Sequence, residues 1–538
     1  MSKHHHFTSP IRHEFAAPML DMPLHKINRR TFMSRLGAGT AATAAALGLR
    51  SGPVCAEETP KPGGHLIVGT DGASTTDSID PTKFLGAFQP LVGFQIYDTL
   101  TDVDEHGNLV PQLAESWAAA ADAKSWVFKI RNGVAFHNGK TLTAADVVYS
   151  LNLHREKDSK SAAKAYLTPV TDVKATGPLE VTVVLDSGNA DVPYIMTDYH
   201  LCIIPEGAKP TACIGTGPFI FDSFEPGVRA RTHRNPNFWQ SGLPYLDSVE
   251  TLGINDPVAR QSALLSGTIH LMNRVNPKVA SIVEQNPQLQ LFNVSGASHY
   301  CFPMRCDTAP FTDKNVRLAL KYAINREKIV KSVLKGYGKI GNDQPIPSFD
   351  PFFASDIPQH GYDPDKARSY MKQSGYDGPI EIHVSDGAFD GSVAAAQVFQ
   401  VDAANAGINI QIVREPADGY WDNVWMKKAF CASFWSGRPT ADLMFSIAYK
   451  SDAPWNESFW KNEKFDALLI AARSELDLGK RKQMYHDMQM MVWNEGGELI
   501  PMFYNFLDGA TKKVRGFKAM PAYELGAYRA PRAIWLES

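Results

Sequence analysis

Arg438 lies in the segment FWSGRPTADL, directly after a tryptophan, a serine and a glycine. A guanidinium group carries a fixed positive charge and only hydrogen-bond donors, so it can hold a carboxylate or a phosphate through two parallel bonds. The segment therefore predicts an anion-binding position, with Trp435, Ser436 and Gly437 as further ligand contacts. The alternative is internal pairing, in which Arg438 binds Asp442, four residues on, or another acid.

Aromatic side chains are frequent in the same part of the chain. A site for a small molecule typically has apolar and aromatic walls with a few polar anchors. We expect Trp421 and Trp435 to form such walls, although core packing is the alternative for each aromatic residue. The aromatic residues concerned are Tyr420, Trp421, Trp425, Phe434, Trp435, Trp455 and Trp460.

A second group of candidate ligand contacts follows the first predicted strand, HLIVGT. The next segment, GASTTDSIDP, is rich in glycine, serine, threonine and aspartate, so hydroxyl and backbone N–H groups are available there. We expect Ser74, Thr75 and Thr76 to contact a ligand, and an ordinary turn fits the same residues equally well.

Motifs of catalysis are missing from the sequence. It contains no GxSxG, no HExxH and no CxxC pair, and GTGPF at residues 215–219 lacks the spacing of a phosphate-binding loop. Scattered histidines are typical of surface or satisfied core positions. We therefore predict no catalytic residue, no metal site and no cofactor. An exported hydrolase, or another enzyme exported by the twin-arginine (Tat) route, is the alternative from a different class.

The hydrophobic pattern alternates between strand and helix periods, which predicts an α/β fold with mixed sheets. A capping box at Thr143 and Asp146 predicts a helix start. Further along, the pattern predicts a strand at 380–384, a helix at 391–406 and a strand at 408–412, which together form a βαβ unit. A long helix at about 478–494 precedes the strand LIPMFY.

The whole chain has the composition of a globular protein: 538 residues, 44% hydrophobic and 21% charged, with a net charge of -3. At roughly 100–200 residues per domain we expect two or three domains. The charge balance and the lack of a basic stripe argue against nucleic acid binding. No apolar run approaches the ~20 residues of a membrane helix.

The N-terminal segment has the features of an export signal. Arg29-Arg30 precedes a short Ala/Gly-rich stretch that ends at Ala56, which predicts a Tat-type signal peptide over residues 1–56 and a periplasmic location. An amphipathic helix is the alternative. In an oxidising compartment the mature cysteines could form bridges, Cys202 with Cys213 and Cys301 with Cys306, or remain buried thiols.

Four stretches resemble one known family, the solute-binding proteins of peptide-type ABC importers: IYDTLTDVDEHGNLVPQLAESW, FKIRNGVAFHNGKTLTAADVVYSL, GTGPF and APFTDKNVRLALKYAINREKIV. The resemblance covers essentially the whole mature chain. It implies a two-lobed periplasmic binding protein (type II) with an extra subdomain in the first lobe and a hinge of two crossing segments. It also implies a monomer that captures a small solute and delivers it to an ABC permease. A chemoreceptor partner or chaperone of the same fold remains an alternative. The implied parts are lobe I at 57–305 with its subdomain at about 94–205, lobe II at 306–495, and a C-terminal return to lobe I at 496–538.

The resemblance also implies a departure in the site. In peptide-binding members a motif similar to Trp-x-x-Asp supplies an aspartate for the amino terminus of the peptide. Here the corresponding residues are Trp435-Ser436-Gly437-Arg438, so a basic residue occupies the acidic position. This favours a solute with an anionic group, such as a peptide-like or amino-acid-derived conjugate or a peptide bound in another orientation. Alternatively the alignment is shifted, and Asp442 is the acidic residue.

Overall fold

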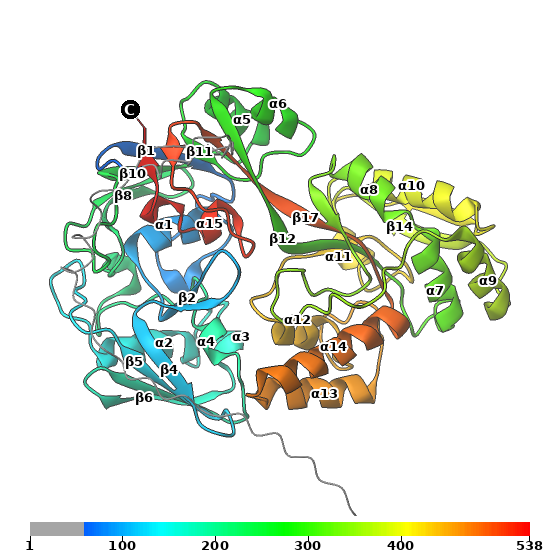
Figure 1. Cartoon of the computed structure of the whole chain (residues 1–538), viewed down its shortest axis with the longest axis horizontal. Coiled ribbons are helices and arrows are strands. Elements are labelled where there is room, and N and C mark those ends of the chain that lie inside the picture. The colour runs from blue at the N-terminus through cyan, green and yellow to red at the C-terminus, as the bar shows by residue number, and fades with distance from the viewer. Residues whose placement is uncertain (1–58, 538) are drawn as a thin grey trace, which may run out of the picture. The chain divides into compact units, whose positions relative to one another are not determined.

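The structure, a computed structural model, describes residues 59–537 (Figure 1), which belong to one compact unit. The predicted signal peptide at residues 1–56 lies outside the described residues. Within residues 59–537, no helix combines the length and the apolar character needed to cross a membrane.

A nine-stranded mixed sheet runs through the molecule in the order β16-β12-β17-β11-β1-β10-β9-β8, with β13 paired to β17. β1 pairs in parallel with β10 and β11, and the remaining pairs are antiparallel. The predicted strand HLIVGT is confirmed as β1. The strands are β1 (His65–Thr70), β8 (Phe219–Glu225), β9 (Arg229–Arg234), β10 (Ser248–Gly253), β11 (Leu271–Met272), β12 (Leu289–Pro303), β13 (Gly338–Ile340), β16 (Ser433–Trp435) and β17 (Glu498–Thr511).

We call the elements around β1, β8, β9, β10 and β11 the first lobe. Its core packs Leu66, Val68 and Val249 against apolar residues of the last thirty residues of the chain, such as Ile534. The chain therefore ends beside the strand with which the described part begins. The helices and short strands of this lobe are η1 (Pro81–Lys83), α1 (Phe88–Ile96), η2 (Pro210–Ala212), α5 (Pro257–Leu265), α6 (Ala280–Gln285), β18 (Val514–Arg515), α15 (Glu524–Ala527), η3 (Ala530–Arg532) and β19 (Trp535–Leu536).

A smaller subdomain with its own apolar core is inserted in the first lobe. Its four-stranded antiparallel sheet has the order β4-β5-β7-β6, and its core draws on residues between Leu100 and Ile203. The predicted capping box is confirmed, because Thr143 and Asp146 exchange hydrogen bonds at the start of α2. The elements are β2 (Thr101–Val103), β3 (Leu109–Pro111), β4 (Ala114–Ala119), β5 (Ser125–Ile130), α2 (Ala144–Arg155), α3 (Lys164–Leu167), β6 (Val170–Gly177), β7 (Glu180–Leu185) and α4 (Val192–Ile195).

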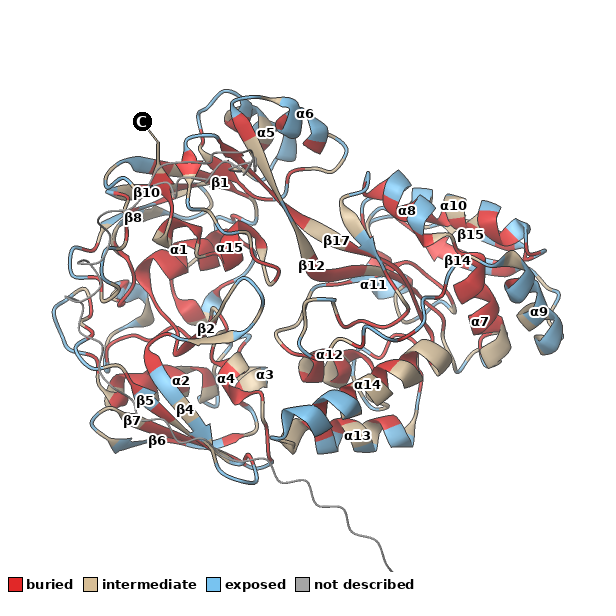
Figure 2. Ribbon diagram, in the orientation of Figure 1, coloured by how far each residue is buried: buried red, intermediate tan, exposed pale blue. Residues whose placement is uncertain are grey.

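The second lobe contains the predicted βαβ unit, since β14 and β15 pair in parallel with α10 between them. Two apolar cores fill this lobe, one around Phe302 and Phe399 and one around Phe445 and Tyr485. Figure 2 shows the outer sides of α9 and α13 exposed. The elements are α7 (Lys314–Ala323), α8 (Arg326–Val333), α9 (Pro364–Ser374), β14 (Ile380–Val384), α10 (Ser392–Ala404), β15 (Ile410–Arg414), α11 (Tyr420–Asn423), α12 (Ala441–Ala448), α13 (Glu463–Ser474) and α14 (Leu478–Glu495).

Two long strands, β12 and β17, run from the first lobe to the second (Figure 1). They pair antiparallel from Leu289↔Thr511 to Pro303↔Glu498, with irregular register between Ser295 and His299. Most of β17 is buried (Figure 2). Because both strands contribute side chains to cores in both lobes, they form the continuous connection between the lobes.

The five cysteines of the described residues, Cys202, Cys213, Cys301, Cys306 and Cys431, are free thiols in the structure. The two bridges considered from the sequence are therefore not formed. Burial raises the pKa of the Cys202 and Cys301 thiols well above the ordinary value, so these side chains act as small apolar residues of the core.

Candidate functional site

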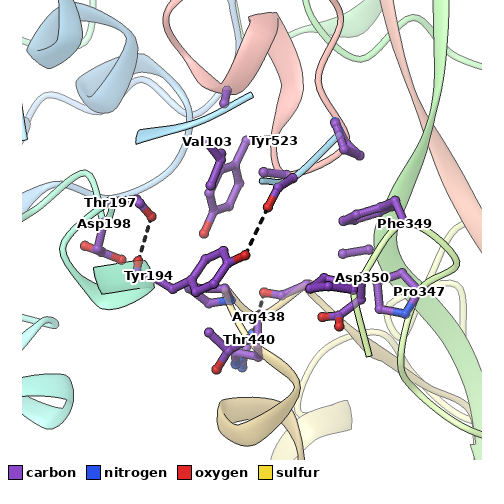
Figure 3. A pocket seen from close by; sticks show the side chains of 18 of the residues that line it. Val103, Tyr194, Thr197, Asp198, Pro347, Phe349, Asp350, Arg438, Thr440 and Tyr523 are labelled. Atoms are coloured by element: carbon purple, nitrogen blue, oxygen red, sulfur yellow. Dashed lines mark hydrogen bonds between the residues drawn. The ribbon is translucent and has the colours of Figure 1, made fainter. Parts of the chain in front are cut away.

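A cavity lies between the two lobes, with about 1020 Å³ of empty space that is partly open to solvent. Its walls come from the first lobe and its subdomain, from the C-terminal segment, from β12 and from two loops of the second lobe (Figure 3). The lining surface is mainly apolar, as in typical small-molecule sites, and it also contains four aspartates and two arginines. The lining includes Phe94, Asp104, Asp191, Tyr194, Asp198, Tyr199, Ala297, Asp350, Phe352, Gly437, Arg438, Tyr523 and Arg529.

The loop between β16 and α12 forms one part of the second-lobe wall. It packs tightly against β12, since the amide of Gly437 donates to Ser298 Oγ at 3.2 Å. A Cβ atom at Gly437 would collide with the Cβ of Ala297. Glycine is therefore required here for space, and the close approach fixes the position of the next residue, Arg438.

Arg438 is half-buried on the cavity wall. Its Nη1 donates to the carbonyl oxygens of Ser436 at 3.0 Å and Gly437 at 3.2 Å, and its guanidinium carbon lies 5.5 Å from the ring centre of Trp435. No carboxylate among residues 59–537 forms an ion pair with it. The other donors of the guanidinium thus remain available to a ligand.

Asp442, the acid considered as an internal partner of Arg438, binds Arg473 instead. The Nε atom of Arg473 donates to both carboxylate oxygens at 3.1 Å. Asp442 is 3% exposed and is not among the residues that line the cavity. This geometry disfavours both alternatives that were open from the sequence, internal pairing with Arg438 and a shifted alignment with Asp442 as the ligand-binding acid.

Tyrosines form the first-lobe wall opposite Arg438. The rings of Tyr199 and Tyr523 meet edge to face with centres 5.9 Å apart. Burial raises the pKa of both phenols, and the charge of Arg438 acts on both in the opposite direction. Arg438 therefore faces neutral aromatic hydroxyl groups across the cavity.

Arg529 is the other arginine among the cavity-lining residues, and it is already neutralised. Its Nε lies 2.8 Å from Asp102 Oδ2, and its guanidinium carbon lies 3.7 Å from the ring centre of Phe94. Arg438 is thus the one lining arginine, within the described part of the chain, whose positive charge lacks an acidic partner.

Four aspartates line the cavity, and all four have partners within the protein. Asp104 accepts hydrogen bonds from the amides of His106 and Asn108 in its own turn, both at 2.9 Å. Asp198 accepts from the amide and the ring of His200, at 2.9 and 2.6 Å. Asp191 contacts Arg481, and Asp350 accepts from the amide of Phe352 at 2.8 Å without forming an ion pair among residues 59–537.

Trp435 does not line the cavity directly. It is 6% exposed, and its indole Nε1 donates to Glu457 Oε1 at 2.6 Å. Glu457 also accepts from Ser433 Oγ at 2.7 Å and from the indole of Trp425. One buried carboxylate therefore holds the strand that leads to Arg438, and burial raises its pKa.

Cys301, Glu457 and Glu498 place potential metal-ligating atoms within 4.8 Å of one another. The oxygens of Glu457 are occupied by the indole and hydroxyl donors, and the Cys301 thiol donates to Glu457 at 3.4 Å. Burial raises the pKa of the thiol and of both carboxyls, so their ligating forms are disfavoured. This cluster fits a structural role better than a metal site.

The remaining candidates lie away from the cavity lining. Ser436 is exposed and contributes its carbonyl oxygen to Arg438. Trp421 is 37% exposed and forms an aromatic group with Trp425 and Phe434, with ring centres 5.8 and 5.6 Å away. A ligand role of these two residues stays a prediction.

The loop after β1 is also outside the cavity lining. Ser74, Thr75 and Thr76 are exposed, the hydroxyls of Ser74 and Thr76 lie 2.9 Å apart, and Asp77 accepts from the Ser74 amide at 2.7 Å. The structure does not bring these three residues to Arg438. Their contact with a ligand stays a prediction, and the turn interpretation accounts for all the bonds seen.

Comparison with known proteins gives one consistent result. The family described as "Bacterial extracellular solute-binding proteins, family 5 Middle" matches residues 108–457, more than half of the chain. The glutathione-binding protein GsiB of Pectobacterium atrosepticum is 25% identical over 472 residues, covering 83% of this chain and 90% of that protein.

Solved structures support the same fold. HbpA2 from Haemophilus parasuis is similar with a TM-score of 0.79 at 21% identity, covering 88% of this chain and 100% of that one. AgaA from A. tumefaciens R10, in complex with agropinic acid, is similar with a TM-score of 0.70 at 22% identity, covering 88% and 99%. These likenesses show the two-lobed fold.

Proposed function

Because the chain belongs to the family 5 bacterial extracellular solute-binding proteins, we propose that it captures a small peptide-like solute with an anionic group in the cavity between its lobes. Proteins of this family bind solutes for ABC importers and are not enzymes. The comparisons give no support to the alternative of an exported hydrolase.

Arg438 is the observation that carries the anionic part of the proposal. Its guanidinium lies on the cavity wall without an acidic partner among residues 59–537, and its donors can bind a carboxylate bidentately. The ring of Trp435 and the tight packing of Gly437 hold it in place. A preorganised cation of this kind favours a bound anion over water.

The solute class is supported by the names of similar proteins. The curated relatives are named glutathione-binding, and AgaA was solved with agropinic acid. Both molecules carry carboxyl groups, which is the chemistry that Arg438 can recognise. For this chain we propose an amino-acid-derived or short peptide solute with at least one carboxylate directed at Arg438.

Lobe closure would supply the transport signal. We propose lobe I at 57–305, lobe II at 306–495 and a return to lobe I at 496–538, with β12 and β17 as the two hinge strands. A solute that contacts both walls binds the closed form more tightly and shifts the population towards closure. The permease would then recognise the closed, monomeric binding protein in the periplasm, after export through the Tat-type signal at residues 1–56.

The test is calorimetry with reduced glutathione and with short peptides, after mass spectrometry has identified any solute that co-purifies. Truncation of one partner of a buried charge contact costs about 2–5 kcal/mol, so Arg438→Ala should weaken binding at least tenfold. Arg438→Lys is the matched control, because it keeps the charge and loses the planar fork. An unchanged affinity of Arg438→Ala would remove this residue as the anchor.

A further inference from the structure

A cluster of buried charges joins the two lobes at the cavity wall. Asp191, at the start of α4 in the subdomain, places Oδ1 2.7 Å from Nη1 of Arg481 on α14 of the second lobe. Behind this contact, Asp442 on α12 binds Arg473 on α13. Asp350, from the loop before α9, lines the same cavity as Asp191, and its pKa responds to Asp191 and Arg481.

The cluster holds one more negative than positive charge. Two arginines each contact one aspartate, and Asp350 is left without a cation among residues 59–537. Its Oδ1 accepts a single hydrogen bond, from the amide of Phe352 at 2.8 Å. Asp350 is half-buried, and a partly desolvated carboxylate without a cationic partner is costly, so an incoming positive charge would be stabilised at this position.

Asp191 is also incompletely satisfied. It is 2% exposed, it lines the cavity, and neither of its oxygens accepts a well-aligned hydrogen bond within residues 59–537. The contact with Arg481 is therefore a charge contact that leaves acceptor capacity on the cavity side. Two carboxylates of different lobes thus line one cavity, and only Asp191 contacts the guanidinium of Arg481.

The groups that face Asp350 can be named element by element. Asp191 and Tyr194 come from the α4 segment, and Arg481 comes from α14. Burial raises the pKa of Asp350 to about 7, and Asp191 adds to the rise, while Arg481 and the amide of Phe352 lower it. Arg438 is not among the charges that act on Asp350.

The cavity is therefore polarised. The charge of Arg438 lowers the pKa of Tyr199 and Tyr523, whereas the charges of Asp350 and Asp191 raise the pKa of Tyr194. Figure 3 shows Arg438 and Asp350 as separate groups of the same cavity. A solute with an acid and an amine can satisfy both groups at once.

We propose that Asp350 is a specificity-determining residue that binds the ammonium group of the solute and thereby completes the charge cluster between the lobes. The inference rests on the proposed function, because it assumes that the solute occupies this cavity with its anionic group at Arg438. The Asp191–Arg481 contact spans the lobes. The added ammonium group therefore compensates the excess negative charge of the cluster where the lobes meet. Occupancy by an ammonium group therefore favours the closed form.

Calorimetry with two probes tests the assignment. Reduced glutathione carries an ammonium group, and N-acetylglutathione retains the carboxylates without it. We expect the wild type to bind glutathione at least tenfold more tightly than the acetylated probe, and Asp350→Asn to lose most of this preference. Asp422→Asn, which removes one exposed aspartate of the same lobe, should keep the preference. If Asp350→Asn weakens the binding of glutathione and of N-acetylglutathione by the same factor, the assignment is wrong.

Proton release gives a second readout that a purely structural role would not produce. Binding of an ammonium group stabilises the ionised carboxylate, so the wild type should release a proton near pH 6.5, seen as a buffer-dependent binding enthalpy. Asp350→Asn should release none. A wild type that binds glutathione without proton release would contradict the proposal.

If neither glutathione nor the short peptides bind the wild type, the proposed solute class has failed and a measurement that needs no solute decides the inference. The carboxyl signal of Asp350 is followed by NMR titration in methylammonium chloride and in sodium chloride at equal ionic strength, with Asp350→Asn for assignment. We expect a lower midpoint in methylammonium. Identical midpoints would show that this carboxylate does not take an ammonium group.

Discussion

Arg438 and Asp350 line the same cavity from the same lobe, but their surroundings differ. Arg438 is half-exposed, its Nη1 binds two backbone carbonyls, and it faces neutral tyrosines. Asp350 accepts one hydrogen bond, from a backbone amide, and burial, with a smaller contribution from the charge of Asp191, raises its pKa and disfavours its charged form. The positive group is therefore stable before a solute arrives, whereas the negative group gains most of its stability when a cation binds.

This difference assigns distinct tasks to the two groups. A charge that is already stable provides affinity for any suitable anion, because little reorganisation is needed on binding. A charge that is costly without its partner discriminates, because a solute lacking the cation leaves a buried carboxylate uncompensated. If this comparison is right, the stability of the charged groups around Asp350 depends strongly on Asp191 and Arg481.

The largest effect is expected at Arg481. Its side chain is 3% exposed, it contacts Asp191, and its charge lowers the pKa of Asp350. Arg481→Met should lower the free energy of unfolding by about 3–5 kcal/mol, because it leaves buried carboxylates without their cation. Urea unfolding followed by tryptophan fluorescence measures the loss. The double variant Arg481→Met/Asp191→Asn should recover part of it, and additive losses would contradict a direct charge interaction.

A smaller effect is expected in the loop that carries Arg438, because the position of this loop is fixed by packing rather than by charge. Gly437→Ala should destabilise the protein by about 1–3 kcal/mol, since the new methyl group collides with the side chain of Ala297 on β12. Its affinity for glutathione should fall as well, because the loop carries Arg438.

The matched rescue is the double variant Gly437→Ala/Ala297→Gly, which removes the opposing methyl group. Calorimetry and urea unfolding should both return towards wild-type values. If the double variant is no better than Gly437→Ala, the tight contact with β12 does not position the arginine loop.

Local signals explain which parts could be predicted from the sequence. The capping box at Thr143 and Asp146 is confirmed as a helix start, because it acts within the first turn of its own helix. The second strand of the βαβ unit was expected at 408–412 and is found at Ile410–Arg414, since its register is set by pairing with Ile380.

The two sides of the cavity differ in the same way. Arg438 could be singled out because its type and its place after Trp435 are visible in the sequence. Asp350 could not, because its importance comes from Asp191 and Arg481, which only the folded chain brings beside it. The tyrosines opposite Arg438 were missed for the same reason, since Tyr199 and Tyr523 are distant in sequence.

The smallest effect concerns the stability of the ligand-free protein and has an unusual sign. The pKa of Asp350 is raised to about 7 in the fold, against about 3.9 in an unfolded chain, so the folded state binds the extra proton between these values. The contribution of Asp350 to stability is therefore complete at low pH and is lost as the pH rises towards 7.

Asp350→Asn cannot ionise, so it should stabilise the ligand-free protein at pH 8 and have little effect at pH 4. We expect about 1 kcal/mol, since part of the side chain contacts solvent. Thermal unfolding of both proteins at the two pH values measures the difference. A variant less stable than the wild type at pH 8 would mean that Asp350 is already compensated without a solute, and the contrast with Arg438 would disappear.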